Sequence, residues 1–132
     1  MAFHVDLTLD TRDAESLAEF WKLALGYEDE PPPAPFTTRA EWVASFGEDP
    51  STGGGAWLRD PSGVGPRLSL LDVPEPKTAK NRLHLDIRTG QWSGVEAKSA
   101  ELVAAGGSVL AVFEGHHIVM ADPEGNEFCV AP

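Results

Sequence analysis

The sequence predicts an α+β fold built from two similar halves, and three observations lead to this expectation. Apolar and polar residues alternate over 3–9 and again over 83–87, which is the pattern of half-buried strands. Each of these segments is followed by apolar residues at the spacing of an amphipathic helix. Each half also contains an Asp-Pro-x-Gly turn that precedes a last short strand.

The first half opens on a strand expected over 3–9, whose odd-numbered apolar residues share one face that should pack under the helices. Asp13 then precedes the first helix, and Gly26 supplies the C-terminal stop of that helix. The last strand of this half is expected over 67–71.

The second half repeats the first at a fixed offset of 80 residues. His4 aligns with His84 and Gly26 aligns with Gly106 at this offset. One strand-helix unit is therefore expected to be used twice.

The second helix is expected to begin at a capping box formed by Ser93 and Glu96 and to end at Gly106. A last strand is then expected over 127–130. Each half is thus expected to consist of a strand, a helix and short antiparallel strands.

Residues 1–132 are expected to form a single domain, with a first module at about 1–73 and a second at about 81–132. The stretch 28–55 breaks the symmetry of the two halves, because it is rich in proline and glycine. A short helix is expected near Thr38 within this insertion. An insertion of this kind forms either a lid over a binding site or a surface loop.

Composition excludes several classes of function. Ten Lys and Arg residues against 21 Asp and Glu residues give a net charge of −11, which repels nucleic acid. Apolar runs are too short to span a bilayer and the first residues do not resemble a secretory leader, so we expect a cytoplasmic protein without a membrane partner. A single cysteine, Cys129, cannot form an internal disulfide and fits a reducing compartment.

The polar residues of the expected strands fall on one face, and we expect this face to line a common hollow. Trp42, in the insertion, and Trp57, near a strand, either pack in the core or form a wall for a flat or apolar ligand. The polar members of the face that carry candidate chemistry are His4, Asp6, Arg67, Ser69, His84, Asp86, Glu127 and Cys129.

Two kinds of site fit this set of side chains. Histidines and carboxylates from separate strands are suitable ligands for a divalent ion such as Zn, Fe, Mn or Ni. The same groups could instead hydrogen-bond one another or water in a pocket that holds no metal. Asp6 and Asp86 could also serve as general bases, and Cys129 is either a small apolar residue or a reactive thiol.

Several phrases of the sequence, taken together, resemble one known family. The matching stretches are Asp13 followed by Phe20-Trp21 and Leu25-Gly26-Tyr27, then Gly65-Pro66-Arg67-Leu68, Val73-Pro74-Glu75-Pro76-Lys77, Lys80 to Asp86 and Met120 to Phe128. They cover nearly the whole chain and resemble the glyoxalase-like domain family of the vicinal oxygen chelate superfamily.

The resemblance implies paired βαβββ modules that form a cupped sheet, usually in a homodimer. The superfamily includes glyoxalase I, extradiol dioxygenases, epimerases, and bleomycin- and fosfomycin-resistance proteins, whose common chemistry is a divalent metal that chelates vicinal oxygens of a substrate. It implies an enzyme of the lyase, isomerase or oxygenase type that acts on a small oxygenated or aromatic metabolite. The alternative is a non-catalytic protein that sequesters a small molecule or drug.

The resemblance also implies site residues, because the metal-dependent members carry a histidine on the first strand of a module and a glutamate on the last. It gives His4, His84 and Glu127 as metal ligands, with Asp6 as an alternative to His4. Cys129 stands where the glutamate is usual, and Glu127 lies two residues earlier on the same face. The expected catalytic residues are Asp6, Asp86 and Glu127, and the expected pocket residues are Arg67, Ser69, Trp42, Trp57 and Cys129.

Overall fold

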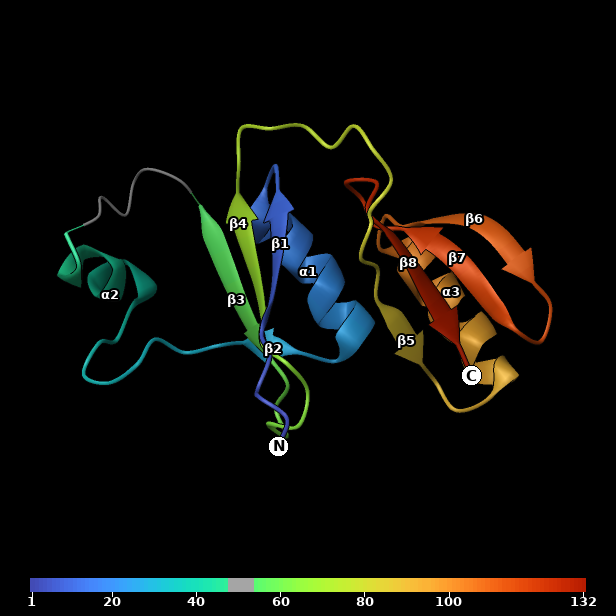
Figure 1. Ribbon diagram of the computed structural model, residues 1–132, viewed down its shortest axis with the longest axis horizontal. Coiled ribbons are helices and arrows are strands. Elements are labelled where there is room, and N and C mark those ends of the chain that lie inside the picture. Colours follow the sequence, from blue (N-terminus) through green and yellow to red (C-terminus); the bar gives the residue numbers. More distant parts are fainter. Residues whose placement is uncertain (48–53) are drawn as a thin grey trace.

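The computed structural model describes residues 1–47 and 54–132 and contains two four-stranded sheets, each with one long helix (Figure 1). In both sheets the first strand pairs in parallel with the last, and the remaining pairs are antiparallel. The α+β expectation is therefore confirmed. In spatial order, sheet A contains β1 (Leu7–Thr11), β4 (Leu68–Asp72), β3 (Gly55–Arg59) and β2 (Glu28–Asp29), and sheet B contains β5 (Asp86–Arg88), β8 (Glu127–Ala131), β7 (His117–Ala121) and β6 (Ser108–Phe113).

The first strand of each half is shorter than the alternation suggested. β1 begins at Leu7, whose N–H donates to the carbonyl of Arg67 at 2.8 Å, and Leu7 lies opposite Leu68 in the register. Leu7 and Leu68 form the first pair of the register, so the pairing does not extend further toward the N-terminus. Phe3, expected on the core face, is 86% exposed and precedes the strand. The expectation that the whole 3–9 stretch is a strand was therefore wrong.

The long helices, α1 (Ala14–Leu25) and α3 (Trp92–Ala104), begin differently. The Asp13 carboxylate accepts from the N–H of Ser16 at 3.2 Å, which caps α1 as expected. The capping box predicted for α3 was wrong, because Gln91 is the N-cap and Ser93 lies inside the helix. None of the helices within the described residues has the length and apolar character required to cross a bilayer.

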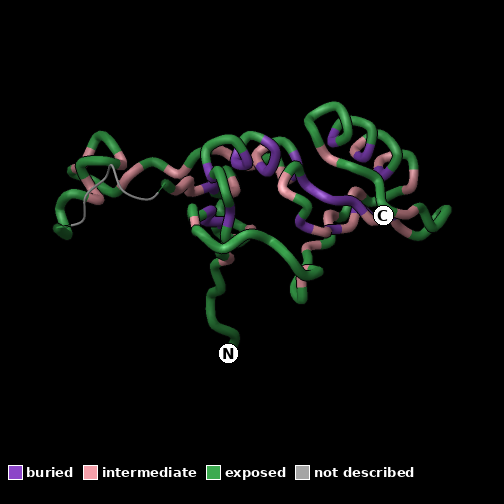
Figure 2. Tube along the Cα trace, turned by 90° about the horizontal axis from the view of Figure 1, so that it is seen from above, coloured by how far each residue is buried: buried purple, intermediate pink, exposed green. Residues whose placement is uncertain are grey.

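Both halves contribute to a single hydrophobic core (Figure 2). Phe20 and Trp21 on α1 both contact Phe128 on β8 edge to face, with ring centroids 5.8 and 5.2 Å apart. Leu58 and Leu70 of sheet A belong to the same cluster of buried residues. Burial of apolar surface therefore stabilises the two sheets together.

The turn between β7 and β8 fixes α1 through two carboxylates. The buried Asp122 side chain accepts from the indole N–H of Trp21 at 3.0 Å. Glu124, two residues later, accepts from the N–H groups of Arg12 and Asp13 at 2.6 and 3.1 Å. Glu124 thus places a negative charge at the positive end of the α1 dipole. A turn of the second half thereby holds the helix of the first half.

The insertion carries the expected short helix, α2 (Arg39–Ser45), which begins at Thr38. The Thr38 hydroxyl accepts from the N–H of Glu41 at 3.1 Å. The guanidinium of Arg39 lies 4.7 Å from the ring centre of Trp42 and 4.5 Å from that of Trp57. α2 lies beyond the β3 side of sheet A, away from sheet B (Figure 1). Part of the glycine-rich stretch expected to follow it, 51–53, lies outside the described residues.

Candidate functional site

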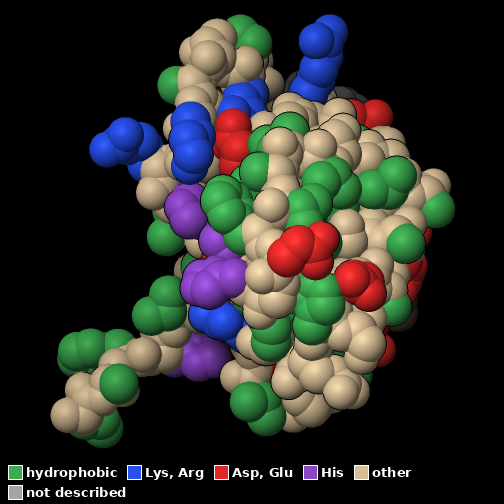
Figure 3. All heavy atoms as spheres, turned by 90° about the vertical axis from the view of Figure 1, so that its right-hand side faces the viewer, with side chains coloured by type: hydrophobic (Ala, Val, Ile, Leu, Met, Phe, Trp, Pro, Cys, Tyr) green, Lys and Arg blue, Asp and Glu red, His purple; other side chains and the backbone are tan. Residues whose placement is uncertain are grey.

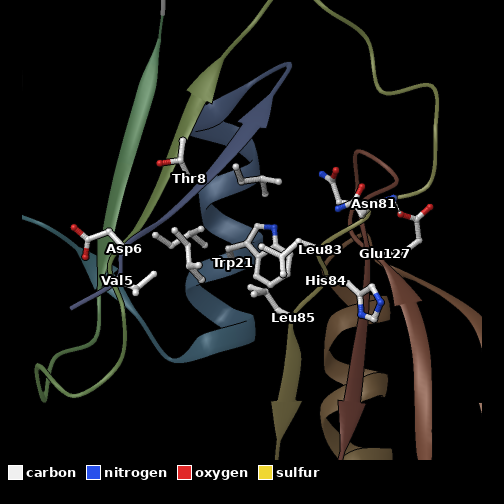
Figure 4. Close-up of a pocket in the computed structure, with 13 residues that line it drawn as sticks. Val5, Asp6, Thr8, Trp21, Asn81, Leu83, His84, Leu85 and Glu127 are labelled. Carbon is white, nitrogen blue, oxygen red and sulfur yellow. Dashed lines mark hydrogen bonds between the residues drawn. The ribbon is translucent and has the colours of Figure 1, made fainter. Parts of the chain in front are cut away.

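A cavity of about 310 Å³ lies between β1 and the segment 81–85 that leads into β5. Figure 4 shows Val5, Asp6 and Thr8 on one side, His84 and Leu85 on the other, and an indole between the two groups. Most of the wall is apolar, as is usual for a small-molecule site. The apolar lining residues are Val5, Leu7, Leu9, Trp21, Leu68, Leu83 and Leu85, and the polar ones are Asp6, Thr8, Asn81, His84, Asn126 and Glu127.

A compact group of side chains that can ligate a metal lies beside this cavity, where the chain enters β5 of sheet B. One ligand atom each from His84, Asp86 and Cys129 lies within 4.8 Å of the others. Asp86 and Cys129 are cross-strand partners in the parallel β5–β8 pair, and the N–H of Cys129 donates to the carbonyl of Leu85 at 2.9 Å. The pairing of β5 with β8 therefore brings three different donor atoms together.

The electrostatics of this group centre on the carboxylate of Asp86. Burial raises the pKa of the Cys129 thiol, and the charge of Asp86 and the hydrogen bond that its carboxylate accepts from the thiol add to the rise. His84 Nδ1 lies 4.0 Å from the Asp86 carboxylate. Without a bound cation, Cys129 is accordingly a protonated thiol rather than a ready nucleophile.

Glu127 lines the cavity but is already engaged by neighbouring groups. Its carboxylate accepts from the N–H of Asn81 at 2.9 Å and from the ammonium of Lys77 at 3.2 Å. The hydrogen bond from Asn81 lowers the pKa of Glu127, and Lys77 contributes to the same shift. Glu127 therefore holds the connector, the segment 73–85 between β4 and β5, against β8. It is a poor proton acceptor at neutral pH.

The two polar residues expected from the first strand are placed differently. Asp6 lines the cavity and lies 3.8 Å from the guanidinium of Arg67. His4 pairs with Asp6 at 3.4 Å, but its side chain is 76% exposed, it precedes β1 and it is not among the residues that line the cavity. Among the described residues of one chain, His4, His84 and Glu127 do not form a common ligand group.

The aromatic and basic pocket residues gather at a second hollow of about 500 Å³. Trp42 and Arg67 line it, and Arg67 donates to the Glu30 carboxylate at 2.7 Å. Trp57, which contacts Trp42, pairs across β3 and β4 with Ser69, and Ser69 is buried. Of the expected pocket residues, Trp42 and Arg67 therefore line this hollow, which adjoins the insertion, and none of the five lines the cavity between β1 and 81–85.

A pair of histidines occupies the β6–β7 hairpin. His117 stacks on Phe113 with ring centroids 4.5 Å apart, and its Nδ1 lies 2.6 Å from that of His116. Figure 3 shows histidine side chains gathered along one border of the face that carries sheet B. His117 is the first residue of β7, and His116 lies in the turn before it.

Sequence reasoning missed the apolar wall of the cavity. Leu83 and Leu85 were expected on a core-facing strand, yet they precede β5 and line the cavity with Trp21. Leu83 is 76% exposed, which no core position would be. The sequence carries no signal for this placement, because Leu83 and Leu85 continue the same alternation as Ile87.

A family model described as a glyoxalase-like domain matches residues 6–131. The chain belongs to the glyoxalase-like domain family. Among curated proteins none matches it significantly.

Solved structures of the vicinal oxygen chelate superfamily share the fold of this glyoxalase-like chain. FosX, a fosfomycin resistance protein from Mesorhizobium loti, superposes with a TM-score of 0.71 at 11% identity over 99% of this chain and 91% of its own. A possible glyoxalase from Bacillus cereus gives 0.68 at 16% identity over the full length of both chains. A mutant FosX from Listeria monocytogenes, complexed with Mn(II) and 1S,2S-dihydroxypropylphosphonic acid, gives 0.67 at 12% identity over 99% and 92%. At these identities the likeness extends to the fold.

The donor set of this glyoxalase-like protein is compatible with a divalent ion. The superfamily includes a Mn(II) complex, and His84, Asp86 and Cys129 supply nitrogen, oxygen and sulfur within one ion's reach. A thiol replaces one of the hard oxygen donors that suit Mn(II) best. The residues present therefore form a possible metal-binding group with one sulfur donor.

Proposed function

We propose that this protein binds a small oxygenated or aromatic metabolite in the cavity beside sheet B and acts on it as an enzyme of the lyase, isomerase or oxygenase type. The observation that carries the proposal is the position of His84, which lines a largely apolar cavity and belongs to the His84–Asp86–Cys129 group. An apolar wall supplies binding energy, and a polar group at one end orients a ligand oxygen.

The residues at this cavity have different proposed roles, which depend on where each one lies. Leu83, Leu85 and Trp21 would exclude water from the apolar part of the ligand. Asp6 is the proposed proton acceptor, and Asp86 takes this role in the protein without an ion. Both carboxylates lie at this site, and within the described part of the chain neither accepts from a backbone N–H as Glu127 does. A bound divalent ion would supply polarisation of a substrate oxygen.

Binding in the cavity is tested with a neutral, environment-sensitive dye, Nile red, and protein treated with a chelator. Leu83→Glu places a charge in the cavity wall, and burying that charge against the dye is unfavourable. We expect dye affinity to fall at least about tenfold, a loss of about 1.4 kcal/mol. Fluorescence titration measures it.

Val64→Glu is the matched control, since Val64 is equally apolar and exposed but lies in the β3–β4 turn and does not line the cavity. This variant should bind the dye like the wild type. Equal affinity for the wild type and Leu83→Glu would refute the proposed binding site.

The second candidate function is non-catalytic sequestration of a small molecule. It is favoured by the engagement of the Glu127 carboxylate with Lys77 and Asn81, which leaves the site without the glutamate ligand usual in the family. The two functions are separated by incubating metal-loaded protein with fosfomycin and with a panel of small dicarbonyl and catechol compounds. Mass-spectrometric conversion of any compound supports the enzyme, whereas binding without conversion supports sequestration.

We propose further that the protein is a homodimer. Strand β6 is an edge strand whose apolar side chains are about half exposed, Phe113 among them. A second copy would remove this surface from water. Light scattering should give twice the chain mass of 14.2 kDa.

Phe113→Glu should reduce the mass to that of one chain, because it places a charge within the covered strand. Val103→Glu is the control, since Val103 is similarly exposed but lies on α3. A monomeric wild type at all concentrations, or dimeric Phe113→Glu, would contradict the proposal.

A further inference from the structure

The three ligand-type side chains at the end of sheet B form an arrangement that the backbone itself determines. His84 and Asp86 are two residues apart, so both project from the same side of an extended segment. Cys129 is the cross-strand partner of Asp86. Phe128 and Val130, on either side of Cys129, are buried in the core and prevent β8 from sliding.

The group also has open access on one side. The side chains of His84 and Asp86 are 43% and 49% exposed, so an ion and an additional small ligand can approach from solvent. Three protein donors leave a coordination position free, as in catalytic rather than structural zinc sites.

The Glu127 carboxylate, an oxygen donor on the same strand as Cys129, is not part of this group. Glu127 is held by Asn81 and Lys77, and the donor that β8 directs toward His84 is the Cys129 sulfur. Thiolate and imidazole ligands favour zinc and cobalt over manganese and magnesium.

We propose that His84, Asp86 and Cys129 form a thiolate-containing site that selects a zinc-class divalent ion over Mn(II). Coordination breaks the S–H bond of Cys129, forms a metal–sulfur bond and releases one proton to solvent. This inference deepens the proposed function, on which it rests for any use of the ion in catalysis, but binding of the ion is tested without a substrate.

The experiment is a titration of untagged, chelator-treated, reduced protein with Co(II), which reports thiolate ligation by a near-ultraviolet charge-transfer absorption. We expect this absorption to saturate at one ion per chain. Zn(II) should displace the cobalt at equimolar concentration, whereas a large excess of Mn(II) should not.

Three variants identify the ligands. Cys129→Ser should abolish the charge-transfer absorption, and His84→Ala should weaken cobalt binding by about 100-fold or more, because each ligand contributes several kcal/mol. Cys129→Glu replaces sulfur with oxygen and should shift the preference toward Mn(II). Far-ultraviolet circular dichroism verifies that each variant is folded, and His84→Ala keeps the test decisive if a substitution at Cys129 prevents folding.

The control is His116→Ala, because His116 and His117 form a close histidine pair outside the proposed site. This variant should bind cobalt like the wild type. Absence of the charge-transfer absorption in the wild type, its persistence in Cys129→Ser, or its loss in His116→Ala would each overturn the proposed site. None of these results affects dye binding by the metal-free protein, so failure of this inference is distinguishable from failure of the proposed function.

Discussion

Replacing Asp122 with alanine should lower the free energy of unfolding by about 3 kcal/mol. The buried Asp122 carboxylate accepts from the indole of Trp21, from the N–H and side-chain amide of Asn126, and from the N–H of Glu124. Alanine leaves these donors without their acceptor in a site that water reaches poorly, and each unsatisfied buried donor is costly. Urea denaturation followed by circular dichroism measures the change.

Asp60→Ala is the matched control, because Asp60 occupies the same position in the Asp-Pro-x-Gly turn of the first half. Its carboxylate accepts from the N–H groups of Ser62 and Gly65 but makes no contact with a buried indole, and it is more accessible to water. The Asp60 variant should lose clearly less stability. An equal decrease in the free energy of unfolding in both variants would show that the buried hydrogen bond to Trp21 does not add to stability.

Phe128→Ala should lower the free energy of unfolding by about 4 kcal/mol, which is typical for truncating a buried phenylalanine. Phe128 is 1% exposed and contacts Phe20 and Trp21 across the boundary between the halves. We propose that the chain folds as one domain, so both sheets should lose their structure in one transition. Tryptophan fluorescence and far-ultraviolet circular dichroism should therefore report the same midpoint.

The control for this prediction is Phe46→Ala, because Phe46 is half exposed at the end of α2 and contacts only Trp42 among the described aromatic rings. Its effect should be within about 1 kcal/mol. Two separated transitions in the wild type, or a Phe128 variant as stable as Phe46→Ala, would contradict a shared core.

The elements of the fold were predictable where the signal is local. Asp13 and Gly26 mark both ends of α1 because capping and a left-handed backbone depend on adjacent residues. The alternation over 3–9 misled because a strand also requires a partner, and β4 provides none before Leu68. The start of α3 failed for a related reason, since Ser93 has the residue type of a cap but not the position.

The sequence predicted which residues belong to the candidate site but not which of them lie close together. Alternation correctly placed Asp86 and Cys129 on one face, yet their direct pairing depends on the parallel register of β5 with β8. That register joins residues 43 positions apart, and no local rule specifies it. The engagement of Glu127 by Lys77 and Asn81 likewise depends on the path of the connector.

The turn that contains Asp122 and Glu124 has an additional consequence for the cavity. Both carboxylates hold α1, one at the indole of Trp21 and the other at the first N–H groups of the helix. The position of Trp21, which lines the cavity, therefore depends on a turn that contributes only Asn126 to the lining. A change in this turn would move Trp21 and so adapt the cavity to a larger or smaller ligand, while the residues that contact the ligand stay the same.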